Sequence, residues 1–460
     1  MCISQRAKIA ADTNHTEDMS CAAAKKTSQI NRLAGLLRHP FLNTMLVYTG
    51  GDVLSKVLPF VLLPIVAHYI SPADFGLLTN FGVAVQILTA ICALNTYTAL
   101  TVYYFQVPKR EIPACFSNLL YLILGLSAVS LVLLLISKGW VHRGLNLDPL
   151  WLIIALVTAA TTSIINLYTA LLRIENKAIE FNIVQIVQSL ATGLIAIVFV
   201  VGFRWGWKGR ALSMAVGPLV LTLIVLALSK KSGLVYAGVE KNKIKEFFYF
   251  GLPLFPHTLS FWLKSGVDKI LISVNVGLAD NGIYSIALTM ASLVGIFTTA
   301  FFNAYAPRFF NYLSLLDESS DEASHQIKKK LVFVIYLFTV ILAVVAALSY
   351  FALSVIIPLL FKLEYQRALT YLPVIMVAVF FDGMYSVVSG FAFYKRKTKI
   401  LGTITFTSSL VQMGLTFLLV RRFGAMGAAM SSATISAMTF LAVLLYSNKL
   451  YRLPWFFSPS

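Results

Sequence analysis

The sequence consists largely of apolar runs, each about as long as a bilayer is thick. A membrane helix needs roughly 20 mostly apolar residues, and such runs follow one another from residue 44 to residue 446. Charged residues make up 12% of the chain and the mean hydropathy is +0.80, whereas a soluble domain carries about 25% charged residues. We therefore predict an all-α, polytopic membrane protein with about 12 transmembrane helices. The spans are expected at 44–70, 77–97, 116–136, 149–171, 181–203, 211–228, 247–276, 284–305, 331–357, 371–392, 401–420 and 425–446.

Two short motifs occur once in each half of the chain. Ala73-Asp74-Phe75-Gly76-Leu77 follows the first span and Ala279-Asp280-Asn281-Gly282-Ile283 follows the seventh. A G-x-x-G-x-A-apolar-S motif precedes the sixth and twelfth spans, at residues 206–213 and 424–431. Because each half holds an even number of spans, both halves enter the membrane from the same side, which indicates a parallel pseudo-two-fold repeat. The predicted layout is an N-terminal tail (1–43), two six-helix bundles (44–228 and 247–446), a basic linker (229–246) and a C-terminal tail (447–460).

The net charge of +18 resides mainly on the segments between spans. Most Lys and Arg residues fall on the tails and on the loops that share their side, so the positive-inside rule predicts that both termini are cytoplasmic. The expected partner of these basic loops is the membrane surface, not nucleic acid. No cleavable signal peptide is visible in residues 1–40, and the four cysteines lack metal-ligand spacing.

Six ionisable residues other than histidine fall inside the predicted spans. Each costs roughly 2.5 to 3.5 kcal/mol at mid-bilayer, so they should face a water-filled interior. Asp52 and Lys56, like Lys264 and Asp268, are four residues apart, and each pair can neutralise itself. Two interpretations stay open: internal salt bridges that fix helix packing, or handling of a substrate or ion. The six are Asp52, Lys56, Lys264, Asp268, Lys269 and Asp382.

Other residues have a functional and a structural interpretation side by side. His257 in the seventh span is either a proton carrier or a neutral packing residue. Arg308 at the inner end of the eighth span either adds positive field to a cavity or extends to the membrane surface. Aromatic residues at 297, 301, 302 and 305 either stack on sugar rings or pack against helices. Hinges are expected at Pro59, Pro64, Gly251, Pro253 and Pro256, which interrupt the first and seventh spans in corresponding places.

Signals of an enzyme are absent from the sequence. There is no P-loop, no HExxH and no nucleophile elbow, and the longest segment outside the predicted spans is the N-terminal tail. We therefore predict a transporter with no catalytic residues, no metal site and no cofactor, and leave coupling to H⁺ or Na⁺ open.

The seventh and eighth spans carry a specific resemblance. They contain Gly251-Leu252-Pro253, then Pro256-His257-Thr258-Leu259-Ser260, Asp268-Lys269 and Gly282-Ile283-Tyr284-Ser285. This order of elements resembles the polysaccharide-transporter branch of the multidrug/oligosaccharidyl-lipid/polysaccharide exporter superfamily, clearly over about 60 residues and less specifically over most of the chain.

The resemblance implies a Wzx-like flippase of the bacterial inner membrane. Its substrate would be an undecaprenyl-diphosphate-linked oligosaccharide for O-antigen, capsule or exopolysaccharide assembly. Lys56 and Lys264 would be candidate contacts for the diphosphate or for sugar acids, and Asp268 and Lys269 the charged pair of the seventh span. Membrane lipids and other membrane proteins of polysaccharide assembly are further expected partners. The alternatives are an ion-coupled drug exporter of the same superfamily and a membrane-embedded polysaccharide polymerase or ligase.

Overall fold

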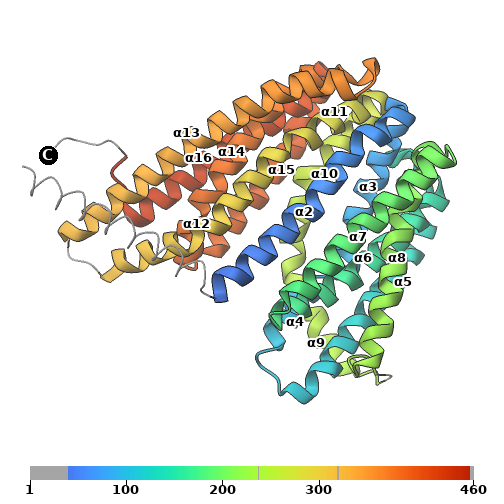
Figure 1. The fold of residues 1–460 in the computed structure, drawn as a ribbon, viewed down its shortest axis with the longest axis horizontal. Coiled ribbons are helices and arrows are strands. Elements are labelled where there is room, and N and C mark those ends of the chain that lie inside the picture. Colours follow the sequence, from blue (N-terminus) through green and yellow to red (C-terminus); the bar gives the residue numbers. More distant parts are fainter. Residues whose placement is uncertain (1–39, 237, 319–320, 456–460) are drawn as a thin grey trace, which may run out of the picture.

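A computed structural model describes residues 40–236, 238–318 and 321–455, and these residues form helices joined by short connections (Figure 1). Ten helical stretches are long and apolar enough to cross a membrane. Two more long helices, α2 and α10, complete the 12 expected spans. The N-terminal half holds α2 (Pro40–Tyr69), α3 (Pro72–Ala93), α4 (Thr96–Tyr103), α5 (Ile112–Leu145), α6 (Pro149–Ile174), α7 (Ala178–Ala196), a π-helical turn (Ile197–Gly202) and α8 (Gly206–Lys231). The C-terminal half holds α9 (Lys241–Gly251), α10 (Phe255–Asn275), α11 (Leu278–Ala291), α12 (Leu293–Glu318), α13 (Asp321–Leu360), α14 (Ala368–Tyr394), α15 (Thr398–Phe423) and α16 (Ala425–Tyr451).

The sequence predicts that proline and glycine interrupt the helices of both the first and the seventh span. The structure has such an interruption only in the seventh span. The seventh is broken, because α9 ends at Gly251 and a 3₁₀ turn (Leu252–Leu254) precedes α10. The first span is one continuous helix through Pro59 and Pro64, so the prediction of a break there is wrong. Proline at 59 leaves the carbonyl of Ser55 without its helical N–H donor. Ser189 on α7 donates its hydroxyl to that carbonyl at 2.9 Å, which explains how the helix continues.

The first repeated motif forms the place where the two halves cross. A Cβ atom on Gly76 of α3 would lie 2.0 Å from the carbonyl oxygen of Leu278, and one on Gly282 of α11 would lie 2.1 Å from that of Pro72. Gly76 and Gly282 are equivalent in the repeat, as are Pro72 and Leu278. The contact is therefore made twice, in the two directions that a pseudo-two-fold axis requires. Only glycine allows backbones to approach this closely.

Buried amides reinforce this crossing. The side-chain oxygen of Asn80 on α3 accepts hydrogen bonds from Ser273 of α10 and Asn281 of α11, both at 3.0 Å. We call this end of the molecule, around residues 69–72 and 275–278, the crossing end. From it the two halves spread apart toward the opposite end, where α9 and the beginning of α13 lie, and α2 runs between them (Figure 1). We call that opposite end the spread end.

The second repeated motif starts two helices in the same way. Gly206 and Gly424, with φ of 55° and 60°, stand where α8 and α16 begin. Three residues on, Gly209 and Gly427 each lie against the backbone of the preceding helical segment, at Phe199 and Leu419. A left-handed residue followed by a close approach favours glycine at both positions, so the motif is structural in both halves.

The connection between the halves, residues 232–240, is bound to α5. The Ser117 hydroxyl donates to the carbonyl of Leu234 and accepts the N–H of Tyr236, each at 3.1 Å. The side-chain oxygen of Asn118 accepts the N–H of Glu240 at 2.8 Å. This part of the predicted basic linker is therefore attached to the N-terminal half. The next place where the α-helical backbone is interrupted is the 3₁₀ turn between α9 and α10.

Candidate binding cavity between the two halves

A cavity with a few polar groups among apolar side chains lies beside α2. One part of it, of about 350 Å³, lies between α2, α3, α8, α10 and α11 and is lined by Thr79, Lys269 and Ser285 among others. A second part, of about 320 Å³, lies between α2, α7 and α8 of the N-terminal half and is lined by Lys56, Gln185 and Gln188 among others. Pro59, Leu62 and Arg210 line both parts, so we treat them as one site, the cationic cavity. Its size suits a small-molecule group.

Arg210 projects into the cationic cavity from the second turn of α8. One of its guanidinium nitrogens donates to Ser213 at 3.0 Å. Among the described residues, no carboxylate lies within salt-bridge distance of it. A guanidinium held at membrane depth without a counter-ion is costly and indicates a functional site. Because the guanidinium presents several N–H donors in one plane, it suits a phosphate or carboxylate.

The sequence analysis missed Arg210, because the sixth span was expected to begin at residue 211. One signal was available. Arg210 follows Gly209 in the repeated motif, and the equivalent position of the second half is Ala428. A charged residue in one copy of a structural motif and an alanine in the other indicates a role that the fold alone does not require.

The Asp268-Lys269 pair divides between two environments. Asp268 is 3% exposed and accepts hydrogen bonds from the hydroxyl of Tyr284 and the N–H of Lys269, both at 2.8 Å. It thereby ties α10 to α11 inside the protein. Lys269 lines the cationic cavity, and its Nζ donates to the carbonyl of Ser265 at 2.6 Å. The carboxylate is thus a packing element, and the ammonium is the group available to a ligand.

Lys264 forms an ion pair with Asp382 of α14, with Nζ 2.5 Å from Oδ1. The interpretation in which Lys264 and Asp268 neutralise each other is therefore wrong, since each has a partner on another helix. Both side chains of the Lys264–Asp382 pair are more than a third exposed. Its charges cancel. The cations among the described lining residues of the cavity are Arg210, Lys269 and Lys56. The lining residues that the structure describes include no acid.

The remaining predicted residues fall into four groups. Lys56 is exposed and lines the cationic cavity, as does Pro59. The side chains of Asp52 and His257 lie outside the described part of the structure. Arg308 is exposed on α12 and lines neither part of the cavity. The aromatic set packs within the C-terminal half, with Phe301 4.4 Å from Phe338 between ring centroids, as the structural interpretation predicts.

Comparison with solved structures shows which class of protein has this fold. The lipid II flippase MurJ in an inward closed conformation superposes with a TM-score of 0.68, at 15% identity, over 88% of this chain and 87% of that one. A multidrug resistance MATE family transporter in an inward-facing conformation superposes with a TM-score of 0.60, at 15% identity, over 89% and 94%. The chain therefore has the fold that these two membrane transporters share.

The sequence narrows this class to one family. Residues 41–313 match the model of the polysaccharide biosynthesis protein family, and the chain belongs to that family. A curated relative, Lsg locus putative protein 1 of Haemophilus influenzae, is 22% identical over 272 residues, which are 58% of this chain and 65% of that protein. An uncharacterized membrane protein of the same organism is 19% identical over 278 residues, 58% of this chain and 64% of that protein.

Proposed function

We propose that this chain is a flippase that moves undecaprenyl-diphosphate-linked oligosaccharide units across the bacterial inner membrane. The product would serve O-antigen, capsule or exopolysaccharide assembly. The observation that carries the proposal is the cationic cavity, one part of which is lined by both Arg210 of α8 and Lys269 of α10 without a described acid in the lining. Charge-assisted hydrogen bonds from a guanidinium and an ammonium are the contacts that a diphosphate makes best.

In the proposed mechanism the halves alternate between two arrangements. The crossing end faces outward and is closed in this structure, while the spread end faces the cytoplasm with both termini. A diphosphate enters the cationic cavity from the cytoplasmic side, and the polyprenyl chain stays in lipid beside the halves. When the contacts between α3 and α11 separate and the spread end closes, the head group leaves on the other side.

The test uses a strain whose surface polysaccharide depends on this protein. Arg210→Ala and Lys269→Ala should each reduce surface polysaccharide about tenfold or more at normal protein level, because each removes one charge-assisted contact. Lys208→Ala is the matched control, since Lys208 is an exposed cation on the same helix two residues away. Wild-type polysaccharide in both cavity variants would refute the proposal.

The second candidate is a drug exporter of the same superfamily. A cavity with three cations and no described acid disfavours the cationic drugs that such exporters would carry, because like charges repel at low dielectric. Measuring antibiotic susceptibility in the deletion strain separates the two functions. Increased susceptibility with unchanged polysaccharide would favour the drug exporter.

A further inference from the structure

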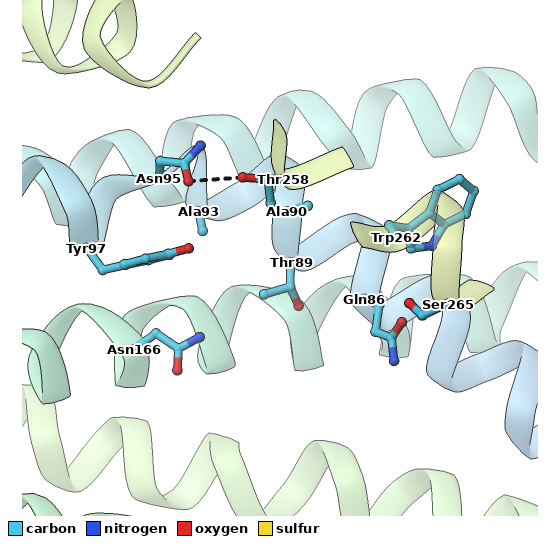
Figure 2. A pocket seen from close by; sticks show the side chains of 10 residues that line it. All are labelled: Gln86, Thr89, Ala90, Ala93, Asn95, Tyr97, Asn166, Thr258, Trp262 and Ser265. Atoms are coloured by element: carbon cyan, nitrogen blue, oxygen red, sulfur yellow. Dashed lines mark hydrogen bonds between the residues drawn. The ribbon is translucent and has the colours of Figure 1, made fainter. Parts of the chain in front are cut away.

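A second pocket, of about 260 Å³, lies closer to the spread end than the cationic cavity. It is enclosed by α3, α4, α6 and α10 (Figure 2). Its wall holds three carboxamides (Gln86, Asn95 and Asn166), several hydroxyls and the indole of Trp262. None of its described lining residues is an Asp, Glu, Lys, Arg or His. We call it the neutral pocket.

Two carboxamides of the neutral pocket are available for a ligand. The carboxamides of Gln86 and Asn166 make no hydrogen bond to any residue that the structure describes, although Gln86 is exposed and Asn166 half-buried within helices that cross the membrane. Figure 2 shows Tyr97 and Asn166 at one end of the pocket and Gln86, Trp262 and Ser265 at the other. Unpaired amides at membrane depth are costly unless water or a ligand satisfies them.

A break in a helix forms one end of this pocket. Leu94 and Asn95, between α3 and α4, have φ of 38° and 58°, and a left-handed leucine is a strained residue. The side-chain oxygen of Asn95 accepts a hydrogen bond from Thr258 at 3.1 Å, whereas its buried nitrogen has no described partner. A Cβ atom on Gly251 would lie 2.1 Å from the carbonyl oxygen of Leu94. The start of the seventh span therefore holds the break in place.

The neutral pocket and the cationic cavity are adjacent along two helices. On α10, Trp262 and Ser265 line the first and Lys269 lines the second. On α3, Gln86 lines the neutral pocket and Thr79 lines the cationic cavity. Seven residues of helix correspond to about 10 Å. The Nζ of Lys269 also donates to the carbonyl of Ser265 at 2.6 Å, so the cation stands at the border between the two sites.

We propose that the neutral pocket binds uncharged sugar residues next to the diphosphate of the substrate, an inference that rests on the proposed function. Carboxamides offer two donors and an acceptor each, which matches neighbouring hydroxyls or an acetamido group. The N–H of Trp262 donates to the carbonyl of Val83 at 3.3 Å, which fixes the indole, and its apolar face matches the face of a sugar ring. A charged ligand would find no counter-charge here, and an apolar one would leave the amides unsatisfied. The sugar lies toward the spread end and the diphosphate toward the crossing end.

The experiment compares two probes on the purified full chain in nanodiscs by calorimetry. Farnesyl diphosphate reports on the cationic cavity, and farnesyl-diphosphate-linked N-acetylglucosamine reports on both sites. We expect the wild type to bind the sugar-bearing probe about tenfold more tightly or better. Asn166→Ala and Gln86→Ala should remove most of that advantage and leave the affinity for farnesyl diphosphate unchanged. Arg210→Ala should weaken both probes.

Controls make each outcome decisive. Asn275→Ala is the matched control, since Asn275 is an exposed amide of α10 bonded to its own helix and lies outside these sites. Asn166→Asp preserves side-chain shape if the alanine variant does not fold. Equal wild-type affinities for the two probes, or variants that weaken both equally, overturn the neutral pocket while the diphosphate site stands. Failure of the wild type to bind either probe overturns the proposed function and this inference with it.

Discussion

Gly76 and Gly282 stand in equivalent positions of the two halves, and each lies against the backbone of the helix that carries the other. An added Cβ would come within 2.0 Å and 2.1 Å of a carbonyl oxygen, respectively. The repeat in the sequence and the closure of the crossing end thus depend on the same pair of residues.

Gly76→Ala should destabilise the closed crossing end. The methyl group cannot be accommodated without moving α3 away from α11, at a cost of about 1 to 3 kcal/mol. Spin labels on the two helices near the crossing end should report a larger mean separation by pulsed electron resonance, and transport should fall. Gly82→Ala is the control on the same helix, since nothing lies within 4 Å of that position. Equal separations in the two variants would contradict the assignment.

Ser189→Ala should destabilise the protein, because Ser189 replaces the N–H donor that proline at position 59 lacks. The variant removes the hydroxyl that donates to the carbonyl of Ser55, at a cost of about 0.5 to 1.5 kcal/mol. With Pro59→Ala in place, the new N–H can bond that carbonyl, and loss of the Ser189 hydroxyl should cost less. A double-mutant cycle on unfolding in detergent measures this coupling. If the effects of the two substitutions on the free energy of unfolding are additive, the Ser189 hydroxyl does not replace the N–H donor that is absent at residue 59.

The Lys264–Asp382 pair can be assigned to packing or to substrate by restoring neutrality. Lys264→Met should impair the protein, by about 1 kcal/mol of stability since the side chains are partly exposed. Lys264→Met combined with Asp382→Asn should recover both stability and surface polysaccharide if the pair only joins α10 to α14. Recovered stability with lost polysaccharide would instead identify Lys264 as a substrate contact.

Asn118→Ala should loosen the junction between Glu240 and the first turn of α9, since the side-chain oxygen of Asn118 accepts the N–H of Glu240, while Ser117 still holds Leu234 and Tyr236. We expect cleavage by trypsin after Lys241 and Lys243 to become several-fold faster at neutral pH, as followed by mass spectrometry. Ser127→Ala is the control, because the hydroxyl of Ser127, on the same helix, donates to the carbonyl of Ile123 and contacts Cys92 of α3. Unchanged cleavage would mean that the attachment to α5 does not protect this segment.

Tyr236→Phe should raise the pKa of Glu240. The hydroxyl of Tyr236 donates to the Glu240 carboxylate at 2.6 Å and, with the Lys243 ammonium, lowers the pKa of that carboxyl below its usual value. Since the folded pKa is depressed, the carboxylate's contribution is present at neutral pH and is lost as pH falls through the lowered pKa. Titration of labelled glutamate by NMR measures the shift. A pKa that does not move would exclude the tyrosine as its main cause.

The positions of the helices followed from the sequence because a bilayer imposes both length and hydropathy on each span. The span expected at 149–171 is α6, Pro149–Ile174, and the one expected at 425–446 is α16, Ala425–Tyr451. The positions of the prolines did not predict reliably where a helix is interrupted. Whether a proline breaks a helix depends on a donor elsewhere, and Ser189 is 134 residues from the carbonyl that it satisfies.

The sequence predicted some of the charged residues that line the candidate site, but it did not predict which charged residues form ion pairs with each other. Charges inside spans identified Lys269 and Lys56, which line the cavity, because such charges require a polar interior. The partner of Lys264 is 118 residues away on α14, and no local spacing indicates it. Arg210 was missed because hydropathy locates the ends of a span poorly, although its side chain enters the cavity from the second turn of α8.

The two glycine contacts have a kinetic consequence. They lie on either side of a single approximate rotation axis, and each is made of backbone that cannot yield as a long side chain can. Lengthening one while keeping the other would require α3 to shear sideways against α11, which the close approach opposes. The two contacts that close the crossing end should therefore separate in one concerted step. A half-open state, through which protons could leak, should hardly be populated.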